Sequence, residues 1–267
     1  MALYLLNLKP VSRSQGRTAV GAAAYRAGVK LYDSRIDKTH NYTRRKDVLH
    51  KEILLPDNSP SRFLDREVLW NEAEFTEKRK DSRVAKEMLV ALQREFFIET
   101  SIKLVREFIS KHIIPLGLCV DFAIHTGDRK GKHFKEYDHE KPFLHNPHSH
   151  ILMTDRPVDE KGFCTKKNLA LNKVAQLMNW RKQWAEILNQ MFIQKGINVK
   201  VSHESYKDRG IKKTPSKHLG PTVAAMERNG IKTRIGDFNR EVMSEKEKKE
   251  LQLQQEYQES HDIEYER

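Results

Sequence analysis

The chain has 267 residues, of which 32% are charged and 38% hydrophobic, and its formal net charge is +12. This length allows one large domain with a sizeable core, and the composition excludes a chain that is disordered throughout. The positive excess indicates a polyanionic partner, most often nucleic acid. The sequence contains no run of about 18 apolar residues, so we expect no membrane span.

Cysteine content and the N-terminal segment indicate where the protein works. Cys119 and Cys164 are too few for a disulfide scaffold, and neither belongs to a CxxC motif. The N-terminal apolar stretch is short, alternates with polar residues and precedes the first charges, which is not the pattern of a signal peptide. We therefore expect a reduced, cytoplasmic protein.

The N-terminal half is expected to alternate strands and helices. Apolar residues at 2–8 predict a first strand, and the alanine-rich segment 17–28 predicts a helix. Residues 33–48 are polar and basic and are expected to form a loop before a short strand at 50–56. The charged segment 61–85 is interpreted as one long helix.

The next segments complete a sheet. An apolar run at 86–93 predicts a strand, and residues 96–117 have apolar side chains at helical spacing up to a Pro-Leu-Gly stop. Strands are expected at 118–126 and 148–155, as an antiparallel pair. Residues 166–196 predict one long helix or two.

The C-terminal region is more polar. A short helix is expected at 222–230, and residues 241–267 are interpreted as a charged tail that is helical or disordered and could lead to a missing C-terminal region. The order of elements predicts an α+β fold, with a central, mostly antiparallel sheet that helices cover on one side.

Three histidines have the spacing of a metal site. In a strand, residues two apart face the same way, so His148 and His150 share a face. If strands 118–126 and 148–154 are neighbours, His125 can join them, and a His₃ set leaves positions open for a substrate. An HxH motif alone is more often a surface loop or a satisfied core pair; the third histidine in a separate strand strengthens the metal interpretation.

Glu87 and Tyr25 are the other chemical candidates. Glu87 shares a strand face with Leu89 and Ala91, where a carboxylate can orient an imidazole or accept a proton; the plain alternative is an exposed strand start. Tyr25 lies near the end of the alanine-rich helix and can serve as a nucleophile; the plain alternative is a buried core tyrosine.

Several motifs in order resemble one known family. They are "LKPVSRSQGRTAVGAAAYRAG", "RVAKEMLVALQRE", "DFAIHTGD", "NPHSHILMT" and "DRGIKKTPSKHLGPTVAAMERNG". Together they resemble the relaxase domain of the MobA/MobL (MobQ) family of plasmid mobilisation proteins, over about residues 1–240. The resemblance implies the palm-type fold of the HUH endonucleases, which nick one DNA strand at an origin of transfer and stay attached to its 5′ end through phosphotyrosine.

The resemblance assigns roles to single positions. It makes Tyr25 the nucleophile, Glu87 the acid/base partner, and Glu95 a second acidic position near the site. The implied metal ligands are His125, His148 and His150. The ion is expected to be Mg²⁺ or Mn²⁺, with Zn²⁺ or Ni²⁺ as alternatives.

The expected partner is single-stranded origin DNA with an adjacent hairpin, together with accessory mobilisation proteins and a type IV coupling protein. Binding to single-stranded DNA needs cations along a groove and rings for the bases. The candidates for this are Arg13, Arg17, Arg26, Tyr42, Arg44, Arg45, Arg79, Lys80 and Arg83.

Three other functions compete with the relaxase interpretation. A rolling-circle replication initiator of the same superfamily usually has its tyrosine after the HUH motif, whereas Tyr25 precedes it. A non-catalytic DNA-binding accessory module would use the histidines structurally. A zinc hydrolase is disfavoured because the sequence lacks HExxH and the deaminase PCxxC motif.

Overall fold

The structure is a computed structural model of the chain, and it describes residues 4–126, 146–212, 214–217 and 219–244. The chain divides into two compact units, Met1–His203 and Glu204–Arg267. Among the described residues, no helix combines the length and the apolar character that crossing a membrane would require.

A five-stranded antiparallel sheet forms the centre of the first unit, in the order β1-β5-β7-β6-β4. Its strands are β1 (Leu6–Ser12), β4 (Val48–Leu54), β5 (Arg83–Ala91), β6 (Val120–His125) and β7 (His148–Thr154). The expected antiparallel pairing of the two histidine-bearing strands is confirmed, because β6 and β7 are neighbours. The α+β class with a mostly antiparallel sheet is confirmed as well.

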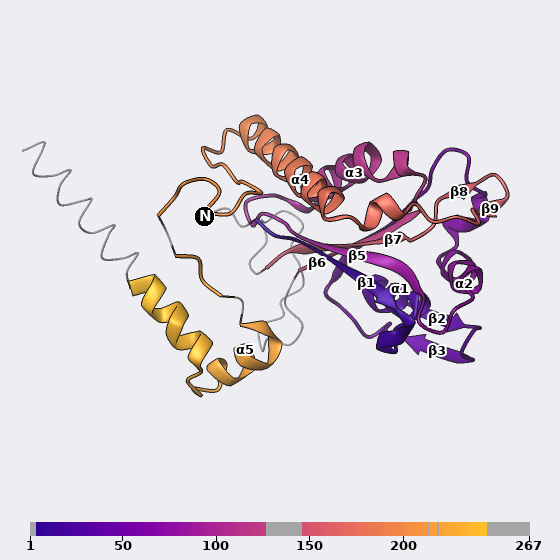
Figure 1. Ribbon diagram of the computed structural model, residues 1–267, viewed down its shortest axis with the longest axis horizontal. Helices are drawn as coiled ribbons and strands as arrows, with labels where there is room; N and C mark the ends of the chain where they lie inside the picture. Colours follow the sequence, from indigo (N-terminus) through magenta and orange to yellow (C-terminus); the bar gives the residue numbers. More distant parts are fainter. Residues whose placement is uncertain (1–3, 127–145, 213, 218, 245–267) are drawn as a thin grey trace, which may run out of the picture. The chain divides into compact units, whose positions relative to one another are not determined.

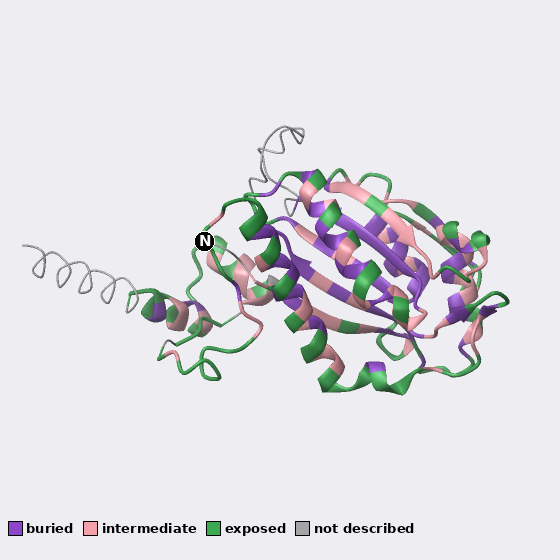
Figure 2. Ribbon diagram, turned by 90° about the horizontal axis from the view of Figure 1, so that it is seen from above, coloured by how far each residue is buried: buried purple, intermediate pink, exposed green. Residues whose placement is uncertain are grey.

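Helices cover both faces of this sheet (Figure 1). One face carries α3 (Ile98–His112) and α4 (Val174–Gln194), and the other carries α1 (Ala19–Ala27) and α2 (Arg66–Thr76). The prediction of helices on one side only was wrong, because the central strands are apolar on both faces and every residue of β6 is buried. Figure 2 shows this buried sheet between helices whose outer sides are exposed.

The larger hydrophobic cluster lies between the sheet and the α3–α4 pair. Trp180 and Trp184 of α4 are fully buried there, and Phe108 of α3 packs edge-on against Trp184 with ring centroids 5.3 Å apart. Burial of each such side chain stabilises the fold by about 2–3 kcal/mol. The other face of the sheet packs against a smaller, alanine-rich hydrophobic cluster. Buried polar groups lie on this face as well.

Helix α1 is the short helix that the alanines predict. Its N-cap residue Thr18 accepts a hydrogen bond from the Gly21 amide at 2.9 Å. Gly28 ends it in the left-handed conformation (φ 62°), and a Cβ there would lie 3.1 Å from Val48 of β4. Glycine therefore allows the helix end to approach the sheet closely.

Several predicted boundaries were wrong. The helix expected over 61–85 is a 3₁₀ turn (Ser61–Leu64) followed by α2, which ends at Thr76. β5 begins at Arg83 and not at residue 86, since Val84, Ala85 and Lys86 are buried together in the first half of the strand. The loop expected over 33–48 contains most of a small hairpin formed by β2 (Lys30–Asp33) and β3 (Lys38–Asn41).

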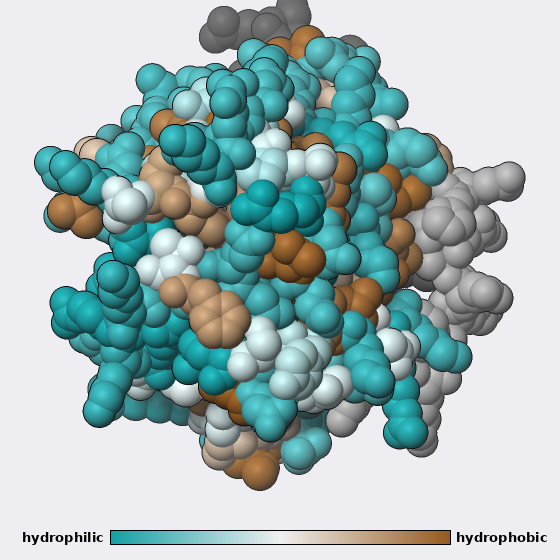
Figure 3. All heavy atoms as spheres, turned by 90° about the vertical axis from the view of Figure 1, so that its right-hand side faces the viewer, coloured by the Kyte–Doolittle hydropathy of each residue, from teal (hydrophilic) through white to brown (hydrophobic). Residues whose placement is uncertain are grey.

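The remaining differences are smaller. The predicted helix at 166–196 is a 3₁₀ turn (Leu169–Asn172) followed by α4. A second small hairpin, β8 (Val158–Asp159) with β9 (Gly162–Phe163), was not expected. Figure 3 shows the face formed by α2 and the two hairpins, where hydrophilic side chains predominate and hydrophobic ones are scattered.

The second unit contains α5 (Gly220–Arg228) and a helix over residues 234–244. Glu227 of α5 accepts hydrogen bonds from Thr233 and from Arg240, each at 2.6 Å, which joins the two helices. Most of the predicted charged tail, 241–267, lies outside the described residues.

Candidate metal centre and nucleophile

Three histidines meet at one end of the sheet, on the face that α1 and α2 cover. His125 ends β6 and lies opposite His148, which starts β7, while His150 lies opposite Ala123. One ring nitrogen of each histidine lies within 4.8 Å of the others. Strand pairing and two-residue spacing therefore bring the three imidazoles together, as the sequence predicted.

Hydrogen bonds determine which nitrogen of each ring has a lone pair available. In each ring one nitrogen faces an oxygen that only accepts, so that nitrogen carries the hydrogen. The pairs are His150 Nδ1 with the Glu87 carboxylate at 2.8 Å, His148 Nδ1 with the Asn146 carbonyl at 2.9 Å, and His125 Nε2 with the Arg26 carbonyl at 2.8 Å. The lone pairs remain on Nε2 of His148 and His150 and on Nδ1 of His125.

Burial favours the neutral form of all three imidazoles. Burial lowers the pKa of His125 to about 3 and that of His148 to about 4, and burial also lowers the pKa of His150. A neutral imidazole is the form that binds a metal ion, and outer partners such as a carboxylate or a carbonyl fix its orientation. The donor set fits a divalent ion that prefers nitrogen or mixed nitrogen and oxygen ligands.

Glu87 lies beside the cluster in a cage of positive groups. Its carboxylate accepts hydrogen bonds from Arg26 at 2.7 Å, from Arg17 at 3.1 Å and from His150 at 2.8 Å. Burial by itself would raise the pKa of Glu87, but His150 and Arg26 lower it well below the usual range of a glutamate. This geometry is that of a carboxylate that orients a histidine, which is one of the two roles considered from the sequence.

Tyr25 lies in the last turn of α1, half-buried, and is linked to the cluster through Arg45. The Arg45 guanidinium carbon is 4.4 Å from the centre of the Tyr25 ring, and a terminal nitrogen of the same side chain is 3.2 Å from His125 Nδ1. Tyr42 packs edge-on against the Tyr25 ring, with centroids 5.1 Å apart. The candidate nucleophile thus lies one side chain away from the candidate metal ligands.

The two other acidic and aromatic candidates lie at the same end of the sheet. Glu95 is exposed in the turn four residues beyond Ala91, and Ala91 lies opposite His148. Tyr42 follows the β2–β3 hairpin and is half-buried against Tyr25.

The arginines proposed for DNA binding fall into three groups. Arg44 is exposed and lines a pocket with Tyr42 and Arg45, and Arg17 is partly exposed with one bond to Glu87. Arg13 and Arg26 are largely buried in ion pairs with Glu74 and Glu87, and Arg45 is paired with Asp47. The exposed residues Arg79, Lys80 and Arg83 lie at the opposite end of β5, about 26 Å along the strand from Ala91.

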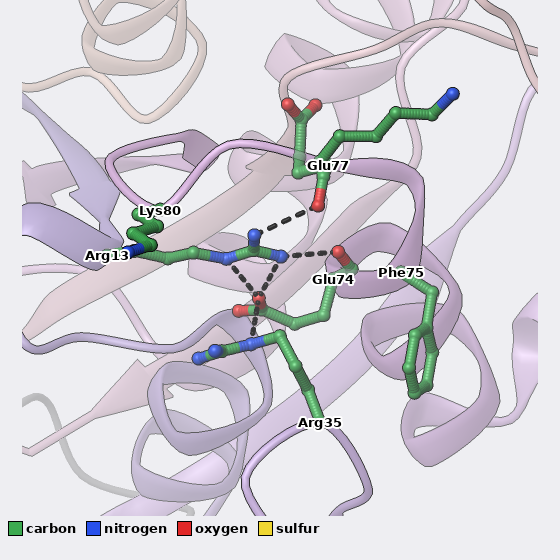
Figure 4. A pocket seen from close by; sticks show the side chains of 7 residues that line it. Arg13, Arg35, Glu74, Phe75, Glu77 and Lys80 are labelled. Atoms are coloured by element: carbon green, nitrogen blue, oxygen red, sulfur yellow. Dashed lines mark hydrogen bonds and ion pairs between the residues drawn. The ribbon is translucent and has the colours of Figure 1, made fainter.

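A second polar cluster fixes the start of the helix that carries Tyr25 (Figure 4). Glu74 of α2 is fully buried and binds Arg13 and Arg35 through Oε2, each at 3.0 Å, and the first amide of α1, Ala19, through Oε1 at 2.6 Å. Arg13, Arg35 and Glu74 line a pocket of about 480 Å³ together with Phe75. A carboxylate at a helix N-terminus also suits the helix dipole.

Two functional positions were not found from the sequence. Asp121 is buried on the histidine face, where it binds Arg66 at 2.7 Å and the Trp70 indole at 3.0 Å, so it attaches α2 to the sheet. The alternation of Asp121, Ala123 and His125 contained that signal. Asp47, which pairs with Arg45, left no comparable pattern in its polar segment.

Comparisons with known proteins agree with the family that the motifs resemble. The family model described as the MobA/MobL family matches residues 17–229. The mobilization protein MobL of Acidithiobacillus ferridurans is 35% identical over 263 residues, which cover 91% of this chain and 69% of that protein. The conjugal transfer protein TraA of Agrobacterium fabrum is 33% identical over 85% of this chain, which spans only 22% of TraA.

A solved structure has the same fold. The chain titled "Molecular Basis of Vancomycin Resistance Transfer in Staphylococcus aureus" is 30% identical, with a TM-score of 0.66 over 77% of this chain and the whole of that chain. With the family model matching most of its length, this chain belongs to the MobA/MobL family.

Proposed function

We propose that this protein is a relaxase, which nicks one strand of origin-of-transfer DNA and remains joined to its 5′ end through Tyr25. The observation that carries the proposal is the convergence of His125, His148 and His150 beside the helix that holds Tyr25. The printed names of the relatives, a mobilization protein and a conjugal transfer protein, support it.

The proposed reaction is a transesterification. The Tyr25 oxygen attacks phosphorus and gives its phenolic proton to solvent, the bond from phosphorus to the 3′ oxygen breaks, and the leaving 3′ oxygen takes up one proton from solvent to become a 3′-hydroxyl. The phosphodiester energy is kept in the tyrosine ester, so the strand can be rejoined without ATP. Tyrosine has a pKa near 10, so a positive environment beside the phenol favours the attack.

Glu87 holds His150 in the proposed mechanism. A carboxylate that accepts three hydrogen bonds and has a lowered pKa is a weak proton acceptor, so the acid/base role implied by the family resemblance receives less support than an orienting role. Glu95, which is exposed at the same sheet end, is a proposed outer acidic group.

The three histidines would hold a divalent ion. When bound, the ion withdraws negative charge from the scissile phosphate and orients it toward Tyr25. Mg²⁺ or Mn²⁺ is the ion that we propose from the family resemblance, and Zn²⁺ or Ni²⁺ is the alternative that imidazole ligands favour.

The proposed substrate is single-stranded DNA next to a hairpin at an origin of transfer. Arg17 binds Glu87, Tyr42 packs against Tyr25, and Arg44 lines a pocket with Arg45. These three residues are proposed to contact the strand near the nick, while Arg79, Lys80 and Arg83 would contact it farther away. Accessory mobilisation proteins, a coupling protein and a cytoplasmic site of action belong to the same proposal. The proposed relaxase domain is residues 1–240, with 241–267 as a tail.

The test is a denaturing gel of the protein incubated with Mn²⁺ and labelled single-stranded oligonucleotides that tile the DNA around its gene. A relaxase gives a slow protein–DNA adduct from one oligonucleotide, and EDTA abolishes it. DNA binding with no adduct from any tile, in Mg²⁺ or Mn²⁺, would instead support the non-catalytic accessory module.

A further inference from the structure

Arg45 is held at the junction between the candidate nucleophile and the candidate metal ligands. It lies in the turn between β3 and β4, where its amide donates to the Tyr42 carbonyl at 3.0 Å, and its side chain is only 12% exposed. Asp47 accepts two hydrogen bonds from the guanidinium, at 2.8 Å and 2.5 Å. Such a bidentate pair fixes the plane and direction of the group.

The fixed guanidinium contacts both Tyr25 and His125. One terminal nitrogen donates to the Tyr25 carbonyl at 2.7 Å, and the guanidinium carbon lies 4.4 Å from the centre of the Tyr25 ring. The other terminal nitrogen lies 3.2 Å from His125 Nδ1. Arg45 therefore places a full positive charge beside the phenol ring while it also donates to a ring of the histidine cluster.

The contact with His125 uses the lone pair that a metal ion needs. His125 Nε2 carries the ring hydrogen, because its neighbour at 2.8 Å is the Arg26 carbonyl. Nδ1 is then the nitrogen with a lone pair, and it accepts from Arg45. One lone pair cannot accept a hydrogen bond and bind a cation at the same time, so Arg45 and the ion compete for His125.

We propose that Arg45 is a positioning residue whose guanidinium gives up its hydrogen bond to His125 and binds a DNA phosphate when the three histidines hold a metal ion. This rests on the proposed relaxase function. In the metal-free protein Arg45 occupies the His125 lone pair; in the loaded protein the freed N–H, still oriented by Asp47, faces the phosphate beside Tyr25. A guanidinium suits this exchange, since its fork of donors matches phosphate oxygens.

The proposed exchange predicts that loss of the Arg45 side chain changes the affinity for Mn²⁺ and the affinity for DNA in opposite directions. Arg45→Ala removes the competitor for His125, so Mn²⁺ should bind about 10-fold more tightly, which is the effect of one net hydrogen bond of about 1.4 kcal/mol. The same variant loses a phosphate contact, so a fluorescein-labelled (dT)₁₅ oligonucleotide in saturating Mn²⁺ should bind about 10-fold more weakly. A residue that only supports the fold would weaken both.

The experiment is calorimetric titration of Mn²⁺ without DNA, followed by fluorescence anisotropy with (dT)₁₅. Lys46→Ala is the matched control, because it removes the same charge from an exposed neighbour and should leave the Mn²⁺ affinity unchanged. Arg45→Gln, which keeps the side-chain stem, is titrated if Arg45→Ala does not fold. Unchanged or weaker Mn²⁺ binding in the folded variant would overturn the proposal.

This result is separate from the test of relaxase function. The Mn²⁺ titration measures the competition between Arg45 and the ion for His125 even if no oligonucleotide is ever cleaved. Tighter Mn²⁺ binding with no adduct from any tile would support the competition and count against the relaxase chemistry, whereas an adduct with unchanged Mn²⁺ binding would count against Arg45 alone.

Discussion

His150 Nδ1 lies 2.8 Å from the Glu87 carboxylate, and this bond connects the candidate metal centre to strand β5. The bond leaves Nε2 of His150 as the nitrogen with a free lone pair. Two arginines, Arg17 and Arg26, hold the carboxylate from its other sides. The orientation of His150 therefore depends on a charge network formed by strand β5, helix α1 and the loop before that helix.

Glu87→Gln should weaken Mn²⁺ binding by about 10- to 100-fold, because the orienting charge behind His150 is lost. Calorimetric titration measures the change. Glu52→Gln is the matched control: Glu52 also pairs with a histidine, His50, at 2.9 Å, but this pair is not part of the cluster. Equal losses in both variants, or no loss in Glu87→Gln, would contradict the role of Glu87.

The metal-free protein should lose stability as the pH falls from 7.5 to 5. The pKa of His148 is about 4 in the folded protein and about 6.5 in the unfolded chain, so between these values the unfolded state binds more protons. His148 alone accounts for about 2 kcal/mol of the loss.

Urea unfolding in EDTA at the two pH values measures this effect. His148→Gln should show a smaller loss between pH 7.5 and 5 than the natural protein, because the glutamine does not titrate. An equal loss in both proteins would mean that His148 ionises normally in the fold.

Glu74→Gln should destabilise the protein by about 3–5 kcal/mol, since it leaves Arg13 and Arg35 without their buried anion. Glu72→Gln, two residues earlier on the same helix, breaks the exposed pair with Arg62 and should cost much less. Thermal and urea unfolding give both values. Similar costs for the two variants would show that Glu74 does not fix the start of α1.

Substitution of Arg44 and of Arg13 should distinguish a residue that contacts DNA from one that stabilises the fold. Arg44→Ala should weaken (dT)₁₅ binding several-fold and reduce the slope of log affinity against log salt by about 0.7, with little change in stability. Arg13→Ala should mainly lower stability, because its guanidinium binds Glu74 and three backbone carbonyls. A salt slope that is unchanged in Arg44→Ala would remove Arg44 from the DNA surface.

The two-residue alternation of side chains within strands predicted the site well. Two-residue alternation placed His148 with His150 and placed Glu87 on an inner face, and the pairing of β6 with β7 then followed from short-range order. The alanines predicted α1 for the same reason, because helix propensity is a local property.

Long-range ion pairs could not be predicted. Arg13 and Arg26 resembled surface cations in the sequence, but their partners Glu74 and Glu87 lie 61 residues away along the chain. The β2–β3 hairpin was missed since only Leu31 and Asp33 of its strands are buried, so it has no hydrophobic pattern to read.

The measurement that most directly tests the relaxase proposal is peptide mass spectrometry of the protein after reaction with its cleaved oligonucleotide and Mn²⁺. The account predicts a nucleotide 5′-phosphate on the peptide that contains Tyr25, and no adduct in Tyr25→Phe, which should still bind the DNA. A nucleotide on any other residue, or an adduct that persists in Tyr25→Phe, would contradict the central claim.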